Sequence, residues 1–140
     1  MPDNDVEYMR VLKQLGGDRG ISFLKTKAEA IRKGVFCYFF KEEKELGFPP
    51  DWHLNPFTGG RASSRVHWTR IPVQSRIFGD IKYIWEPGRF ANAYILTRAY
   101  RATGDEEYAE SFWQLVESWG KHNPPNCGKF LAACRKLGQA

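Results

Sequence analysis

The sequence predicts a mainly α protein. Three observations indicate this fold class. Apolar residues recur at helical spacing before residue 35 and again over residues 87–122, glycine or proline residues end each of these patterns, and strand-like alternation is scarce. The chain of 140 residues has the length of one domain, 1–140, and can bury roughly two-thirds of its unfolded surface on folding.

Two helices are expected before residue 35. The first has apolar residues at i, i+3, i+4 and i+7, which are Tyr8, Val11, Leu12 and Leu15. Gly16 and Gly17 end it. Asp18 can cap a second helix, which Gly34 ends and whose apolar face carries Ile21, Leu24, Ala28 and Ile31. The short apolar run at 35–40 is either a strand or a buried extended segment, because periodicity does not separate the two.

Residues 45–79 follow neither a helical nor a strand period. Glycines and prolines interrupt this stretch throughout, and Trp52, Phe57 and Trp68 lie among them. A loop of roughly this length is uncommon inside a compact domain, and it is usually functional when it is ordered. The large aromatic residues argue against disorder. We therefore expect a long, ordered, irregular loop that wraps over the helices and forms one rim of a binding surface.

The next helix is expected to begin at Pro87 and to end near Thr103. Its apolar residues lie almost all round, so it requires neighbours on both flanks. Gly104 ends it, and Asp105 can cap another helix that runs to Asn123. The link between the two is four residues or shorter, which predicts an antiparallel αα-hairpin.

Composition restricts the function. A net charge of +5 permits an anionic partner, but the basic residues are spread and no nucleic-acid-binding motif is present, so nucleic acid is not expected. The histidines are isolated, and the three cysteines form no CxxC pair, so we expect no metal site and idle thiols in a reducing compartment. No signal region or bilayer-spanning run is visible, so as written the chain reads as cytoplasmic, without a membrane partner.

The run GDIKYIWEPGRF at 79–90 concentrates charged and aromatic groups. Aromatic rings can stack on pyranose faces, and an arginine fork can pair with a carboxylate or sulfate. We therefore expect Trp85 and Trp52 to stack on sugar rings and Arg89 with Lys82 to pair with anionic groups. Glu86 would orient those cations or bond sugar hydroxyls, as would Asp80. This makes an anionic polysaccharide the expected partner.

A structural interpretation of the same residues stays open. In it, Glu86 faces a helix dipole, Pro87 occupies the first helical turn and Trp85 packs on the core. Loop aromatics such as Trp52 would then pin the irregular segment to the core instead of binding sugar.

Several stretches occur together in a recognisable order. They are WHLNP at 52–56 with Thr58 and Gly59, residues 68–72, GDIK at 79–82 with Trp85, Glu86 and Arg89, AY at 99–100 with TGD at 103–105 and YA at 108–109, and Trp119 with NPP at 123–125. Over about residues 35–128 the chain thereby resembles the N-terminal region of the heparinase II/III-like polysaccharide lyase family. After Gly128 it departs from the family pattern, so 129–140 is interpreted as a divergent tail.

The resemblance implies a partial α/α toroid of helical hairpins, followed in full-length members by an antiparallel β-sandwich. It implies β-elimination of uronic-acid-containing polysaccharides such as heparan sulfate or alginate, with no cofactor. A base, Tyr or His, would remove the C5 proton, and an acid would protonate the leaving oxygen. The catalytic Asn, Tyr and His of the family lie mostly beyond residue 140, so no catalytic residue is assigned.

Three functions are therefore expected from the sequence. In the first, the chain is an N-terminal fragment of a polysaccharide lyase that is inactive alone. In the second, it is a non-catalytic helical module that binds anionic saccharide. In the third, it is a non-functional remnant, and the two-sided apolar helix predicts exposed hydrophobic surface and self-association.

Overall fold

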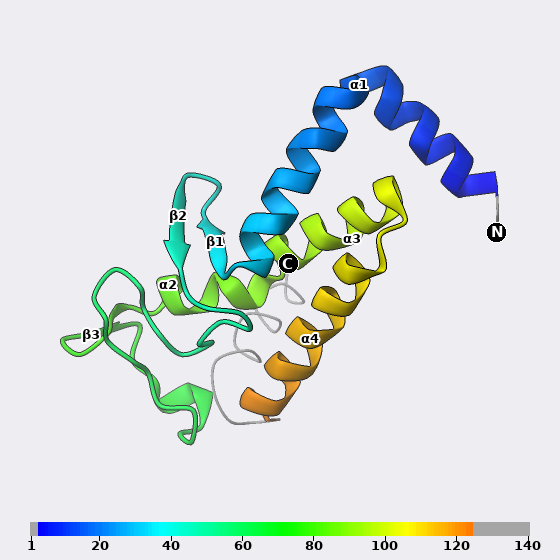
Figure 1. Ribbon diagram of the computed structural model, residues 1–140. Coiled ribbons are helices and arrows are strands. Elements are labelled where there is room, and N and C mark those ends of the chain that lie inside the picture. Colours follow the sequence, from blue (N-terminus) through cyan, green and yellow to red (C-terminus); the bar gives the residue numbers. More distant parts are fainter. Residues whose placement is uncertain (1–2, 125–140) are drawn as a thin grey trace, which may run out of the picture.

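The computed structural model describes residues 3–124 and is mainly helical, as the sequence predicts (Figure 1). The long helices are α1 (Asp3–Arg32), α3 (Ala91–Thr103) and α4 (Glu106–His122). Two antiparallel ribbons pair β1 (Val35–Tyr38) with β2 (Glu42–Glu45) and β3 (Gln74–Ser75) with β4 (Gly79–Asp80). Short helical turns are η1 (Trp68–Arg70), α2 (Lys82–Trp85) and η2 (Pro87–Arg89). The predicted tail at 129–140, with Cys127 and Cys134, lies outside the described residues.

Helix α1 bends sharply at Gly17, whose φ of 53° and ψ of −154° lie outside the helical region (Figure 1). The sequence predicts two helices that meet at this glycine, and the break confirms it. In the second half of α1, the side chains of Leu24, Ala28 and Ile31 are buried. Their spacing of three and four residues places them on one face, which packs on α3.

Helices α3 and α4 form the predicted αα-hairpin (Figure 1). The chain turns at Gly104, and the carboxylate of Asp105 caps α4 by accepting a hydrogen bond from Glu107 N at 3.1 Å. Because α1 and α4 both pack on α3, the predicted need of α3 for two neighbours is met. Tyr94 lies outside these contacts and is exposed.

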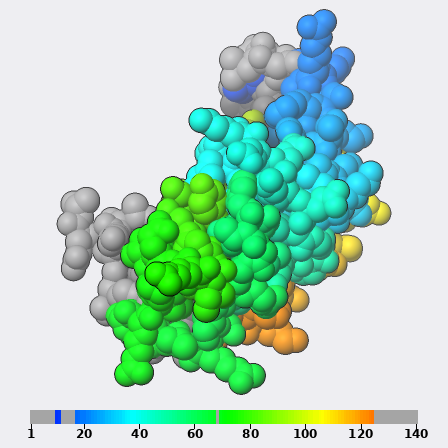
Figure 2. Space-filling view, turned by 90° about the vertical axis from the view of Figure 1, so that its left-hand side faces the viewer, coloured from blue at the N-terminus to red at the C-terminus, as the bar shows by residue number. Residues whose placement is uncertain are grey.

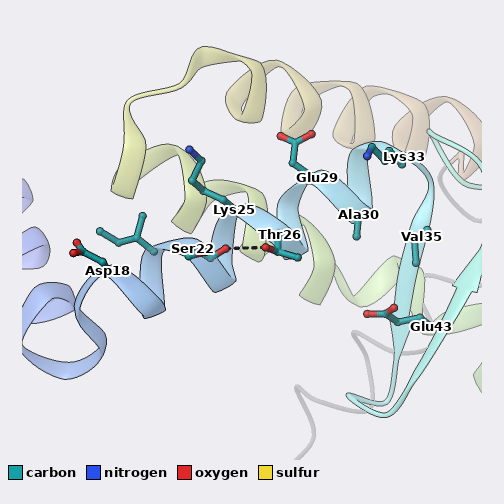
Figure 3. Close-up of a pocket in the computed structure, with 10 residues that line it drawn as sticks. Asp18, Ser22, Lys25, Thr26, Glu29, Ala30, Lys33, Val35 and Glu43 are labelled. Carbon is teal, nitrogen blue, oxygen red and sulfur yellow. Dashed lines mark hydrogen bonds between the residues drawn. The ribbon is translucent and has the colours of Figure 1, made fainter.

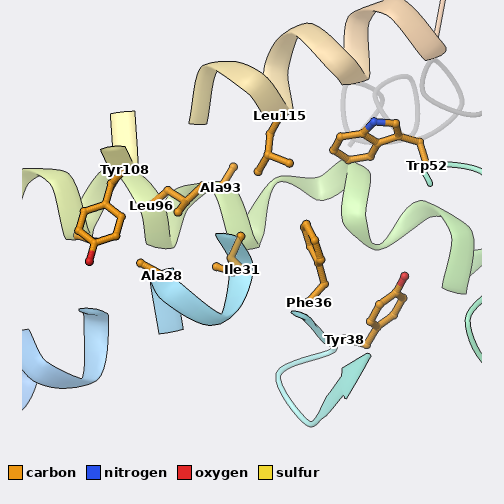
Figure 4. Close-up of a cluster of buried hydrophobic side chains, with 10 residues drawn as sticks. Ala28, Ile31, Phe36, Tyr38, Trp52, Ala93, Leu96, Tyr108 and Leu115 are labelled. Atoms are coloured by element: carbon orange, nitrogen blue, oxygen red, sulfur yellow. The ribbon is translucent and has the colours of Figure 1, made fainter. Parts of the chain in front are cut away.

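The main core joins α1, β1, α3 and α4 with one indole from the irregular segment (Figure 4). Its buried members are Ala28, Ile31, Phe36, Tyr38, Trp52, Ala93, Leu96, Ala99, Tyr108 and Leu115. Burial of a side chain the size of leucine or isoleucine stabilises a fold by about 1.5–3 kcal/mol. The core therefore ties the N-terminal helix to the αα-hairpin.

Of the two alternatives for the run at 35–40, the structure has the strand, β1, over Val35–Tyr38. Its partner strand β2 was not predicted. Strand β2 reads EEKE, which has no apolar alternation to reveal it. The opposite edge of β1 is closed by Asn92, a buried residue in the first turn of α3. Its side chain accepts a hydrogen bond from Cys37 N at 3.1 Å and donates one to Cys37 O at 3.2 Å. The asparagine thus replaces a neighbouring strand at this edge.

The segment between β2 and α2 is irregular but ordered by hydrogen bonds, as expected. Buried Asn55 organises it: its amide donates to Phe78 O at 2.7 Å and accepts from Phe57 N at 2.9 Å. Gly60 allows the closest approach, because a Cβ there would lie 1.9 Å from Ile77 O. This contact locks residues 55–60 against the β3–β4 ribbon.

The predicted start of a long helix at Pro87 is wrong. Pro87 begins the separate turn η2, and α3 starts at Ala91 after Phe90, which is left-handed with φ of 59°. The ring of Phe90 stacks on Trp52 at 6.0 Å and meets the edge of Trp119 at 5.7 Å. This packing offsets a backbone cost of roughly 1–2 kcal/mol for the left-handed conformation.

Candidate functional site

The run at 79–89 places its two cations on the surface and its acids beneath them. Asp80 accepts from Lys82 N at 3.0 Å and pairs with Lys82 Nζ at 3.2 Å. The hydrogen bond from Lys82 N is the main reason that the pKa of Asp80 lies below its usual value. The side chain of Lys82 remains 50% exposed. Asp80 therefore holds the ammonium group in place without covering it.

Glu86 is the structural centre of this region. Its side chain is only 6% exposed, and its Oε1 accepts from Phe39 N, at the tip of the β1–β2 hairpin, at 3.2 Å. Its Oε2 lies 3.3 Å from Arg89 Nε, and the arginine side chain is 60% exposed. One buried carboxylate thus joins the hairpin tip to an exposed guanidinium. The contact is an ion pair without a hydrogen bond, since Glu86 Oε2 has no hydrogen-bond partner among the described residues. The two terminal nitrogens of Arg89 can still form a fork for an anion.

The pairing of Glu86 with Arg89 agrees with the expectation that Glu86 orients a cation, but its burial corrects the rest of both sequence interpretations. It cannot bond a sugar hydroxyl at the surface, and it precedes no long helix whose dipole it could face. Its carboxylate instead lies near the buried hydroxyl of Tyr38, which has no hydrogen-bond partner among residues 3–124. Burial, with a smaller contribution from the charge of Glu86, raises the pKa of Tyr38 well above its ordinary value.

The two predicted stacking indoles do not form open platforms. Trp52 is only 5% exposed, donates from Nε1 to Ser118 Oγ at 3.0 Å and stacks on Phe90. Trp52 is therefore not open to a sugar ring in this structure, and its burial agrees with the alternative interpretation, a plug that pins the loop to the core. Trp85 is partly buried against a second cluster that contains Phe78 and Ile84. Burial of a ring as large as an indole stabilises the fold, so these two side chains pack inside instead of facing solvent.

The structure brings other aromatic residues to the cations. The ring of Phe57 lies 4.7 Å from that of Tyr83, which in turn meets the edge of Phe39 at 5.5 Å. Lys44 Nζ lies 4.5 Å from the ring centre of Phe57, and Lys82 Nζ lies 5.2 Å from that of Tyr83. We call Phe57, Tyr83, Lys44, Lys82 and Arg89, together with Phe40, which follows Phe39 in the chain at the hairpin tip, the ring–cation patch.

On one face of the molecule the cyan hairpin and the green segment lie side by side (Figure 2), and the contacts of Lys44 with Phe57 and of Phe39 with Tyr83 join these two segments at the ring–cation patch. The sequence predicted only Lys82 and Arg89 among its members. Tyr83 stood inside the singled-out run, and the FF pair at 39–40 was a visible signal. The sequence analysis included this FF pair in the apolar run at 35–40, because neither β2 nor the hairpin turn before it was predicted.

A separate hollow of about 820 Å³ lies along α1 beside the start of the β1–β2 hairpin (Figure 3). Its charged lining residues are Asp18, Lys25, Glu29, Lys33 and Glu43. The mixed signs give no field that would favour an anionic polymer. The cations of the ring–cation patch are paired with carboxylates as well, but that patch sets aromatic rings beside them, which the lining of the hollow lacks.

Among residues 3–124, no three His, Cys, Asp or Glu side chains are grouped so that they could hold a metal ion. In the same part of the chain, no helix combines the length and apolar character needed to span a bilayer. Comparisons of the chain with models of known protein families, with curated protein sequences and with solved structures each found no match.

Proposed function

We propose that this chain forms part of the saccharide-binding wall of a heparinase II/III-like polysaccharide lyase, which cleaves uronic-acid-containing polymers by β-elimination. The observation that carries the proposal is the run at 79–89. Its residue order resembles that of the family, and its two cations, Lys82 and Arg89, are at least half exposed above buried or paired acids.

The partial α/α toroid is part of the same proposal. The αα-hairpin of α3 and α4 and the packing of α1 on α3 support it, because toroids of this class are built from such helical hairpins. The exposed side of α1, where the mixed-charge hollow lies, is where a further hairpin would be expected to pack.

The chemistry of elimination explains why cations would be needed here. Removal of the C5 proton from a uronate places negative charge next to the carboxylate, and the reaction is slow unless that charge is neutralised. Arg89 can offer its terminal nitrogens to a carboxylate while Nε stays on Glu86. Lys82 supplies a second positive charge, suited to a sulfate or to the next uronate.

The proton-transfer groups of the reaction are not assigned to this chain. His53 is buried, and its Nε2 lies 3.0 Å from the carbonyl oxygen of His122. The hydroxyl of Tyr38 is buried as well. Neither of these two groups can reach a polymer on the surface, so neither is assigned as the base of the elimination.

A binding titration combined with a turnover assay tests the proposal. Heparan sulfate and alginate oligomers are titrated into the wild type, Arg89→Ala and Lys82→Ala, with Arg19→Ala, an exposed arginine on α1, as the matched control. We expect Arg89→Ala to weaken binding roughly five- to tenfold at low salt. Arg19→Ala should change it by less than about twofold.

Absorbance of the unsaturated uronate product reports turnover in the same samples. We expect none from the isolated chain. Efficient cleavage would show that the assignment of catalytic groups elsewhere is wrong, and absence of binding to every anionic oligomer would reject the saccharide-binding function. Binding without cleavage by a longer polypeptide that contains this chain would favour the non-catalytic module instead.

A further inference from the structure

We propose that Phe40, at the tip of the β1–β2 hairpin, is the stacking platform of the ring–cation patch and binds the apolar face of one pyranose ring. This inference rests on the proposed function and names the contact that the buried Trp52 cannot make. Its ligand is a saccharide unit that carries a carboxylate or sulfate.

Phe40 is the most exposed ring of the patch. Its residue is 87% exposed, whereas Phe57 is much less so and Tyr83 is partly buried. An isolated exposed aromatic residue is ordinary on protein surfaces, so exposure alone would carry no conclusion. Phe40 also has an unusual backbone conformation within the hairpin turn.

The backbone of the turn is held in an uncommon conformation. Phe39 and Phe40 have φ angles of 50° and 60°, in the left-handed region that bulky residues seldom adopt. Two contacts hold it: Lys41 N donates to Tyr38 O at 2.9 Å, and Phe39 N donates to buried Glu86 at 3.2 Å. Such conformations persist where the surroundings over-determine them, often at ligand-binding positions. The ring of Phe40 is thus presented on a fixed support.

Within the described residues, the other rings of the patch already have ring or cation contacts. Phe39 and Tyr83 pack edge to face, and Lys44 and Lys82 lie over Phe57 and Tyr83. Phe40 makes no comparable ring or cation contact among the described residues. A single open platform suits one pyranose ring, whereas single-stranded nucleic acid favours successive platforms for successive bases.

The cations near the hairpin tip favour a ligand that carries negative charge. Glu86 accepts from the backbone of Phe39 and pairs with Arg89, so the hairpin tip and the guanidinium share one anchor. Lys82 is linked to Phe39 through the ring of Tyr83. Lys82 and Arg89 are ion-paired with Asp80 and Glu86, but both stay at least half exposed. A ligand that lies on Phe40 therefore has cationic donors nearby, which suits an anionic sugar better than an uncharged apolar partner.

The test compares Phe40→Ala with Phe40→Tyr and with Phe23→Ala. Phe23 is a matched control, because it is a 61% exposed phenylalanine on α1 with Lys27 Nζ 5.8 Å from its ring centre. Heparan sulfate and alginate hexasaccharides are titrated at several salt concentrations, with an oligothymidylate as a competing ligand class. Thermal unfolding of each variant verifies that it folds.

We expect Phe40→Ala to weaken hexasaccharide binding roughly tenfold without changing its salt dependence, since no charge is removed. Phe40→Tyr should stay within about twofold of the wild type, as should Phe23→Ala. Arg89→Ala should instead weaken both binding and its salt dependence.

The outcomes separate this inference from the proposed function. If the wild type binds and Arg89→Ala weakens binding while Phe40→Ala does not, only the role of Phe40 is rejected. If the wild type binds no anionic oligosaccharide, both proposals are rejected. Tighter binding of the oligothymidylate than of the hexasaccharides would reject the pyranose assignment, and an equal loss in Phe23→Ala would reject the location.

Discussion

Replacement of Asn92 by alanine should detach the β1–β2 hairpin from α3. The asparagine side chain is buried and makes two hydrogen bonds with the backbone of Cys37, at 3.1 Å and 3.2 Å. Asn92→Ala removes both partners at once. Cys37 N–H and C=O would then lie at the edge of β1 without a protein partner among the described residues.

The expected cost follows from these two groups. A buried backbone donor or acceptor without a partner costs about 1–3 kcal/mol. Cys37 is partly exposed, so water can recover some of this loss, and we expect a total of about 2–4 kcal/mol. In a domain whose stability is about 5–15 kcal/mol, this is a large change. It should lower Tm by roughly 10 °C.

Urea unfolding followed by far-UV circular dichroism measures the free energy of unfolding. The matched control is Asn123→Ala, which removes one hydrogen bond, from Asn123 Nδ2 to Trp119 O at 2.9 Å, at the end of α4. We expect this control to cost no more than about 1 kcal/mol. If Asn92→Ala costs no more than the control, the asparagine does not hold the hairpin.

Asn92→Asp separates the two hydrogen bonds. An aspartate can still accept from Cys37 N–H, but its second oxygen would face Cys37 O, so a charged side chain is destabilising there. Burial would raise the pKa of the new carboxyl group, so it binds protons more tightly in the folded state. The variant should therefore lose stability as pH rises through the acid range, relative to the wild type. An unchanged pH profile would contradict this geometry.

Two further predictions concern the loop and the core. Gly60→Ala should lower the free energy of unfolding by about 2–4 kcal/mol, because a Cβ would lie 1.9 Å from Ile77 O. Its control is Gly120→Ala, where a Cβ would have nothing within 4 Å, and this change should be neutral or stabilising by up to ~1 kcal/mol. Equal effects of the two changes in urea titrations would disprove the close approach at Gly60. Burial and then the neighbouring Glu29 raise the pKa of Tyr108 to about 12, so its contribution to stability is complete below the unfolded pKa near 10 and is lost as pH rises towards 12. Tyr108→Phe should reduce the slope of stability against pH over this window, and an identical slope would refute the assignment.

The helices were readable from the sequence because their signals are local. Apolar spacing of three and four residues marked α1, α3 and α4, and Asp105 marked the start of α4. The kink at Gly17 was readable for the same reason, since only a short stretch of chain is involved. The start of α3 was not, because Phe90 takes its left-handed conformation in contact with Trp52 and Trp119, which are distant in sequence.

The candidate site was only partly predictable. Lys82 and Arg89 were predicted because the run at 79–90 concentrates charged and aromatic groups of the kind that bind an anionic sugar. Phe40, Phe57 and Lys44 were missed, since their relation to Tyr83 depends on a hairpin whose second strand carries no apolar pattern. Trp52 was assigned to the surface because composition alone does not distinguish a stacking platform from a loop plug.

By itself, the sequence determined the mainly α class, the helix boundaries set by caps and glycines, and the surplus of positive charge. Only the tertiary structure decided that Glu86 is a buried anchor, that Asn92 closes a strand edge and that Trp52 lies in the core. The physical reason is separation along the chain: these side chains find their hydrogen-bond partners 47, 55 and 66 residues away. Helical periods and caps act within a few residues, whereas the burial of a polar or aromatic group depends on which distant segments meet it.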